Sequence, residues 1–111
     1  MILCILVSVI GYNELCEDYD YPDIGLNYCR SAAKQMNTPF RVTDTSEDPP
    51  EYKTPKHCYM QQSQIIMDNV VWYNKDPNGK RHKGFRPVCE RKFGHSQPKA
   101  LHMIFQLNTK T

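Results

Sequence analysis

The hydrophobic residues first follow a helical spacing, over the range 24–36 of the chain. Asp23 precedes this range and is suited to cap the first turn, and the run Asn37-Thr38-Pro39 is suited to end the helix. The pattern predicts an amphipathic helix with Cys29 on its buried face. Its outward side chains are expected to be Arg30, Lys34 and Gln35.

After the helix, the apolar residues alternate or run together as they do in β-strands. The strongest such segment is Asn69–Asn74. The other predicted strands are Phe40–Thr43, Cys58–Met67, Lys83–Cys89 and Ala100–Leu107. Because Asp44–Lys56 holds three prolines among polar residues, it is predicted to be a loop.

A turn is predicted at Asp76-Pro77-Asn78-Gly79, where Asn-Gly is suited to positive φ. This turn would join Asn69–Asn74 to a return strand at Lys83–Cys89 as a hairpin. Pro87 lacks an N–H group, so it predicts a bend in that strand or a place at the sheet edge. Together the elements predict an α+β fold, with one N-terminal helix packed on an antiparallel sheet of about four strands.

The first eleven residues, Met1–Gly11, carry no charge, and the sequence becomes polar and acidic from Tyr12. Such an apolar run is typical of a signal peptide, with Val9 and Gly11 at the positions that signal peptidase reads. It is too short to span a bilayer, which needs roughly 20 apolar residues. We therefore predict cleavage and a single secreted domain, 12–111. The alternative is an N-terminal core strand, since Ile, Val and Leu also favour strands.

Removing the leader also removes Cys4 and leaves four cysteines, an even number that suits two disulfides. Four cysteines allow three pairings, of which we expect Cys16–Cys89 and Cys29–Cys58. Their spacing is not that of a zinc or redox site, so we expect neither a metal nor a cofactor. Disulfides and a leader together predict a secreted, extracellular protein.

The charges are divided along the chain, although the net charge is only +2. Residues 12–52 include nine acidic and three basic side chains, whereas residues 53–111 include three acidic and eleven basic ones. Clustered cations near aromatic rings suit a nucleic acid. The alternative is a solvated loop whose charge is offset by the acidic half of the same molecule. The candidate binding residues are Lys80, Arg81, Lys83 and Arg86, with Tyr73 as an adjacent aromatic.

The stretch Val70–Asn74, which leads through an Asn-Gly turn to Lys83-Gly84-Phe85, is similar to the central hairpin of fungal guanyl-specific ribonucleases. The chain also resembles the small ribonuclease-like secreted effectors of powdery mildew fungi. The shared features are the length, the leader, a late cysteine at Cys89, and an aromatic-plus-cysteine element at Tyr28-Cys29 or Tyr12–Cys16. The resemblance covers about Pro22 to Cys89 and implies a protein delivered to a host.

A ribonuclease of that family uses a glutamate base and a histidine acid beside an arginine. The resemblance places the base strand at His57–Gln61, the arginine near Asp68-Asn69 and the acid near Arg86–Val88, and none of these segments holds the required residue. His82 and His95 are alternatives for the acid, but the carboxylate would still be missing. A hydrolytic triad at Ser96 has no local carboxylate, and bridged cysteines are not thiolates. We therefore expect no enzymatic activity.

The expected function is that of a secreted, monomeric, non-catalytic ribonuclease-like effector that binds a host protein or RNA through the basic side chains. The alternative is a secreted small-ligand carrier or an inhibitor from an animal. Carriers of the insect odorant-binding type are mostly helical, and inhibitors usually hold more cysteines for their length. Neither description fits this chain as well as the effector does.

Overall fold

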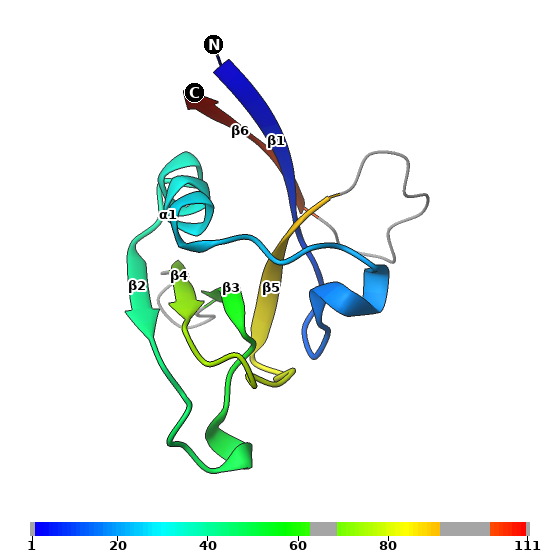
Figure 1. Cartoon of the computed structure of the whole chain (residues 1–111), viewed down its shortest axis with the longest axis vertical. Helices are drawn as coiled ribbons and strands as arrows, with labels where there is room; N and C mark the ends of the chain where they lie inside the picture. Colours follow the sequence, from blue (N-terminus) through cyan, green and yellow to red (C-terminus); the bar gives the residue numbers. More distant parts are fainter. Residues whose placement is uncertain (1, 63–68, 92–102, 111) are drawn as a thin grey trace.

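The computed structural model describes residues 2–62, 69–91 and 103–110 (Figure 1). Within these residues the chain forms one α-helix, α1 (Leu26–Gln35), and two 3-10 helices, η1 (Cys16–Tyr19) and η2 (Pro50–Tyr52). All described strands join one sheet in the order β2-β4-β3-β5-β1-β6. The strands are β1 (Ile2–Val9), β2 (Phe40–Thr43), β3 (His57–Gln62), β4 (Asn69–Asn74), β5 (Phe85–Glu90) and β6 (Met103–Lys110).

The α+β class with one helix on a sheet is confirmed, but the predicted sheet of about four antiparallel strands is wrong. Six strands form the sheet, and β2 pairs with β4 in parallel while the other pairs are antiparallel. Strand propensity reports that a segment is extended and not which neighbour it takes. The chain enters β2 directly from α1 and pairs with the free edge of β4, so long-range packing decides the direction.

The hairpin of consecutive strands is formed by β3 and β4, with Tyr59 opposite Trp72. The predicted hairpin of β4 and β5 is wrong, because β3 lies between them. The Asp76–Gly79 turn is present, but it lies within a crossover connection, residues 75–84, that joins β4 to β5. Neither Asn78 nor Gly79 lies in the left-handed region of φ that the sequence predicted. Glycine fits here because a Cβ at Gly79 would lie 2.5 Å from the backbone nitrogen of Lys56.

Helix α1 begins later than the pattern predicted, with Gly25 and not Asp23 at the N-cap. Asp23 instead forms an isolated β-bridge with Cys89. The helix ends at Gln35, just before the predicted stop, where Asn37 has φ of 53°. Its buried side chains include Cys29, and the predicted outward residues are exposed, which confirms the amphipathic pattern. The outward residues are Arg30, Lys34 and Gln35.

The two disulfides lie on opposite faces of the sheet. Cys16 bonds to Cys89 and Cys29 bonds to Cys58, which is the pairing expected from the sequence. Because Tyr59 lies opposite Pro87, Cys58 and Val88 share one face and Cys89 points to the other. One disulfide therefore ties α1 to the first face, and the other ties η1 to the second. The chain crosses between the faces at Pro22 and Asp23, where Glu90 donates its N–H to the Pro22 carbonyl at 2.9 Å.

Two apolar clusters fill these faces. The larger one lies between α1 and the sheet and includes Val7, Val9, Met60, Val71 and Val88. The smaller one surrounds the Cys16–Cys89 bond. Its other buried members are Ile10 and Tyr21.

The N-terminal segment forms β1, which lies between β5 and β6 and runs antiparallel to both. Val7, Val9 and Ile10 are fully buried. In the folded full chain the segment thus takes the alternative form, a core strand. Cleavage after Gly11 during export stays a prediction.

Pro87 lies in β5, which is an interior strand, so the predicted edge position is wrong. The Pro87 carbonyl accepts the Ile10 N–H at 3.0 Å. The strand tolerates proline because the Arg86 side chain donates to the Ile10 carbonyl from Nε at 2.7 Å. Of the other predicted strands, Cys58–Met67 is described only to Gln62 and Ala100–Leu107 only from Met103. The remaining residues of both lie outside the described part of the chain.

Candidate partner-binding surface

The crossover 75–84 carries the exposed cations of the predicted binding surface. Because β4 ends opposite His57 and β5 begins opposite Gln61, the crossover runs back along the length of β3. Two backbone hydrogen bonds fix it: Lys80 N–H donates to the Thr54 carbonyl at 2.9 Å, and Asn13 N–H donates to the His82 carbonyl at 3.1 Å. These contacts hold the crossover against the N-terminal segment and the loop after β2.

Lys80, Arg81 and Lys83 are exposed on this crossover. Arg81 makes a two-pronged contact with Asp18 of η1, Nη1 to Oδ2 and Nη2 to Oδ1, each at 3.0 Å. Such a fork-to-fork pair is among the stronger charge-assisted contacts that proteins make. We define the basic rim as Lys80, Arg81 and Lys83. One of its three cations is already paired within the molecule.

Arg86 does not belong to the basic rim. Its side chain is buried, with 7% of the residue exposed. Besides the Nε contact, Nη2 lies 3.4 Å from the Val9 carbonyl, and the guanidinium lies 5.7 Å from the ring centre of Tyr12. Folding commits this cation to the backbone carbonyls of Val9 and Ile10, so the predicted exposed position of Arg86 is not found, and its role in partner binding stays a prediction.

Tyr73 is also separated from the rim. It lies opposite Cys58 in the sheet, so it shares the face that α1 covers. There it packs half-buried against the larger apolar cluster, with its ring 5.8 Å from that of His57. The rim, in contrast, contacts η1 on the opposite side. The structure therefore does not bring Tyr73 and the cations together.

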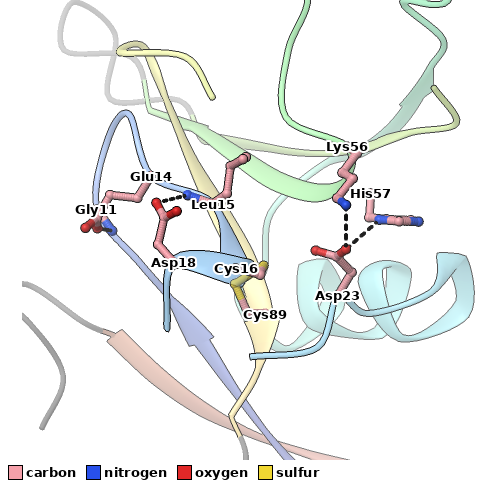
Figure 2. Close-up of a disulfide and its surroundings, with 9 residues drawn as sticks. All are labelled: Gly11, Glu14, Leu15, Cys16, Asp18, Asp23, Lys56, His57 and Cys89. Carbon is pink, nitrogen blue, oxygen red and sulfur yellow. Dashed lines mark hydrogen bonds and ion pairs between the residues drawn. A yellow bond between two sulfur atoms is a disulfide. The ribbon is translucent and has the colours of Figure 1, made fainter. Parts of the chain in front are cut away.

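The acidic and basic parts of the chain meet in several ion pairs. Asp18 pairs with Arg81, and Asp23 lies 3.1 Å from Nδ1 of His57 and 3.8 Å from Nζ of Lys56. Figure 2 shows Asp23 pointing toward both residues, beside the Cys16–Cys89 disulfide. The charge division in the sequence is thus partly neutralised within the fold, as the solvated-loop alternative proposed.

The Asp23–His57 pair is a feature that sequence reasoning missed. His57 has φ of 63°, an unusual value for a residue other than glycine. Its second ring nitrogen points away from Asp23 (Figure 2). The contact is a close approach rather than an aligned hydrogen bond, because Nδ1 is buried without hydrogen-bond geometry to a partner. The separation of 34 positions in the sequence explains why no local pattern revealed it.

The sheet residues on which the resemblance would place the catalytic base are engaged with aromatic neighbours. The Gln61 side chain accepts the indole N–H of Trp72 at 3.0 Å. Tyr59 is buried against Phe85, with ring centres 5.0 Å apart, and burial raises the pKa of its phenol. The ring of His82 packs 4.6 Å from that of Phe85, and its Nδ1 accepts the Gly84 N–H at 2.9 Å. The side chains in this part of the sheet are therefore held in place by aromatic packing and by hydrogen bonds to their neighbours.

A buried polar cluster closes the base of the loop that follows β2. Asp76 accepts hydrogen bonds from Lys53 Nζ at 2.7 Å and from the Thr45 hydroxyl at 2.9 Å. The Lys53 hydrogen bond is the main reason that the pKa of Asp76 lies below its usual value. Asn74 joins the same cluster, donating to Thr45 Oγ1 at 2.9 Å and to the Thr54 carbonyl at 3.2 Å. We call these residues the loop clamp: Thr45, Lys53, Thr54, Asn74 and Asp76.

Within residues 2–62, 69–91 and 103–110, no group of three or more His, Cys, Asp or Glu side chains is placed to hold a metal ion. No α-helix in this part of the chain has the length and hydropathy needed to cross a bilayer. His95, Ser96 and His102 lie outside it.

Comparison of the chain with protein-family models, with curated proteins and with solved structures gives no match.

Proposed function

We propose that the protein is a secreted, non-enzymatic effector of the ribonuclease-like type, and that it binds a host protein. The observation that carries the choice of a protein partner is the Arg81–Asp18 pair. A phosphate backbone is bound by cations that are free to replace its counterions. Arg81, in the basic rim, is already paired with a carboxylate, and Arg86, outside the rim, is committed to the backbone carbonyl of Ile10. A surface of mixed charge suits a protein better than RNA.

Two further observations support this proposal. The two disulfides fit an oxidising compartment such as the one outside the cell. Gln61, at the position that the resemblance gives to the catalytic base, holds an amide that accepts the Trp72 N–H and has no carboxylate to remove a proton.

A photo-reactive amino acid placed at Lys83, in the basic rim, tests the proposal. We expect a discrete crosslink to a host protein in host extract, unchanged by ribonuclease treatment and suppressed by excess unmodified protein. The matched control carries the same group at Lys34, an exposed cation on α1. Equal crosslinking from the two positions, or loss of the Lys83 adduct on ribonuclease treatment, would contradict a protein partner at the rim.

RNA is the second candidate, because Lys80 and Lys83 remain exposed. If RNA were the partner, the affinity of the protein for a single-stranded RNA oligonucleotide would fall steeply as the salt concentration rises. Replacing both lysines by Ala would then lower the logarithmic salt slope by about 0.7 for each cation. We expect instead that the protein binds RNA weakly. Replacing Lys80 and Lys83 should then change the RNA affinity no more than Lys34→Ala does. Robust RNA cleavage that is abolished by His95→Ala would overturn the non-enzymatic proposal.

A further inference from the structure

The tip of the loop between β2 and β3 exposes an aromatic side chain. Residues 46–52 are all exposed, and 68% of Tyr52 is accessible to solvent. This is the largest exposure among the large hydrophobic side chains of residues 6–62 and 69–91. For comparison, Tyr21 and Tyr59 are exposed by 4% and 2%. A single exposed tyrosine is ordinary on a protein surface. The residues that precede Tyr52, however, make the tip a candidate recognition site.

Two prolines precede Tyr52, so the tip reads Pro49-Pro50-Glu51-Tyr52. Pro49 has φ of −58° and ψ of 154°, close to the polyproline II conformation. Pro50 then begins the one-turn helix η2, and Tyr52 N–H donates to the Pro49 carbonyl at 2.9 Å. This closed turn brings the two ends of the tip, Pro49 and Tyr52, near each other. A proline ring and a tyrosine ring are therefore displayed together.

The loop clamp holds this tip on a rigid base. Both sides of the loop contribute to the clamp, since Thr45 precedes the tip and Lys53 follows it. Lys53 Nζ donates to the Thr45 carbonyl at 2.8 Å as well as to Asp76. Asp76 is 1% exposed and Asn74 is fully buried. Because the base is fixed and proline restricts φ, the tip loses less conformational freedom than an open loop would when a partner binds. Pro49 is already extended, whereas Pro50 lies in η2 and would have to leave it to extend.

The chemistry of a suitable partner follows from these groups. Proline rings in an extended segment dock between aromatic side chains, as in the grooves of SH3 and WW domains. The phenol two residues after the second proline calls for an adjacent pocket. The surrounding carboxylates, Glu47, Asp48 and Glu51, would meet basic side chains at the rim of that groove.

We infer that the Pro49–Tyr52 tip is a recognition motif for a host domain of the WW class, which binds a Pro-Pro-x-Tyr segment in an aromatic-lined groove. The motif shares no residue with the basic rim, although the Lys80 N–H bonds to the Thr54 carbonyl two residues after Tyr52. Substitutions can therefore test the motif and the rim one at a time. It adds a defined class of partner that the rim does not specify.

Calorimetric titration of the oxidised full chain with purified WW domains of the Pro-Pro-x-Tyr class tests the inference, with an SH3 domain as the proline-binding control. We expect a WW domain to bind, and Tyr52→Ala and Pro49→Ala each to weaken the affinity by ~10-fold or more. Both side chains are exposed, so these variants should keep the fold; circular dichroism checks this. The matched control is Tyr28→Ala, since Tyr28 is an exposed tyrosine on α1.

The Tyr28→Ala protein should bind as the unmodified chain does. The inference is overturned if no WW domain in the panel binds more tightly than the SH3 control. It is also overturned if Tyr52→Ala binds with unchanged affinity, since binding would then use another part of the surface. Neither result would affect the crosslinking expected at Lys83, so failure of this inference is distinguishable from failure of the proposed function.

Discussion

The Arg86 guanidinium donates from Nε to the Ile10 carbonyl at 2.7 Å. In a regular antiparallel pair this carbonyl would accept the backbone N–H of residue 87, whose own carbonyl does accept the Ile10 N–H at 3.0 Å. Residue 87 is proline and has no N–H. The side chain of one residue thus replaces the donor that its neighbour lacks, at the point where β1 leaves the sheet.

Replacing Arg86 should therefore destabilise the full chain. In Arg86→Ala the buried Ile10 carbonyl loses its donor, which costs about 1–3 kcal/mol in the free energy of unfolding. The double variant Arg86→Ala with Pro87→Ala restores a backbone N–H and should recover part of this loss. Urea denaturation of the three proteins measures the effect. A double variant that is less stable than Arg86→Ala alone would show that the two positions are not linked through Ile10.

Removing residues 1–11 should also weaken the fold. Val7, Val9 and Ile10 are fully buried, and burying such a side chain contributes about 1.5–3 kcal/mol. We expect a chain that begins at Tyr12 to unfold at a lower urea concentration than the full chain, with both in the oxidised state. Equal stability would mean that β1 contributes little to the folded domain. Intact-mass measurement of the protein exported from cells tests separately whether cleavage after Gly11 occurs.

The two disulfides should differ in their contribution to stability. The Cys16–Cys89 bond closes a separation of 73 residues and the Cys29–Cys58 bond one of 29. On the loop-entropy model these correspond to about 4.4 and about 3.6 kcal/mol. Replacing each pair by two alanines should thus be more destabilising at Cys16–Cys89, as measured by denaturant unfolding. The reverse order would show that packing beneath α1 outweighs loop closure.

Acid should loosen the loop after β2. The Lys53 hydrogen bond lowers the pKa of Asp76 in the folded state. The carboxylate therefore adds stability above its unfolded pKa of about 3.9, and this contribution is lost as the pH falls through the lower folded value. We expect Asp76→Asn to be less stable at neutral pH and to lose less stability below roughly pH 4. Asp48→Asn, at the exposed tip, is the control and should follow the unmodified protein.

Local patterns predicted the buried stripe of α1 and its ending before Asn37, because both depend on residues close in sequence. They also located β4 with the bounds that the structure shows. Local patterns could not predict which strands pair with one another. The parallel pairing of β2 and the insertion of β3 between β4 and β5 depend on contacts between distant segments. The same holds for Asp23, which the pattern assigned to a helix cap and the fold assigns to Lys56 and His57.

The sequence by itself determined the α+β class, the amphipathic helix, the division of charge and an even set of four cysteines in residues 12–111. Each of these follows from spacing and composition. Only the tertiary structure decided which cations remain available. It buries Arg86 beside a proline and pairs Arg81 with Asp18, 63 positions away. Solvent exposure and charge pairing are properties of the folded surface, because they depend on which distant groups packing brings within a few ångströms.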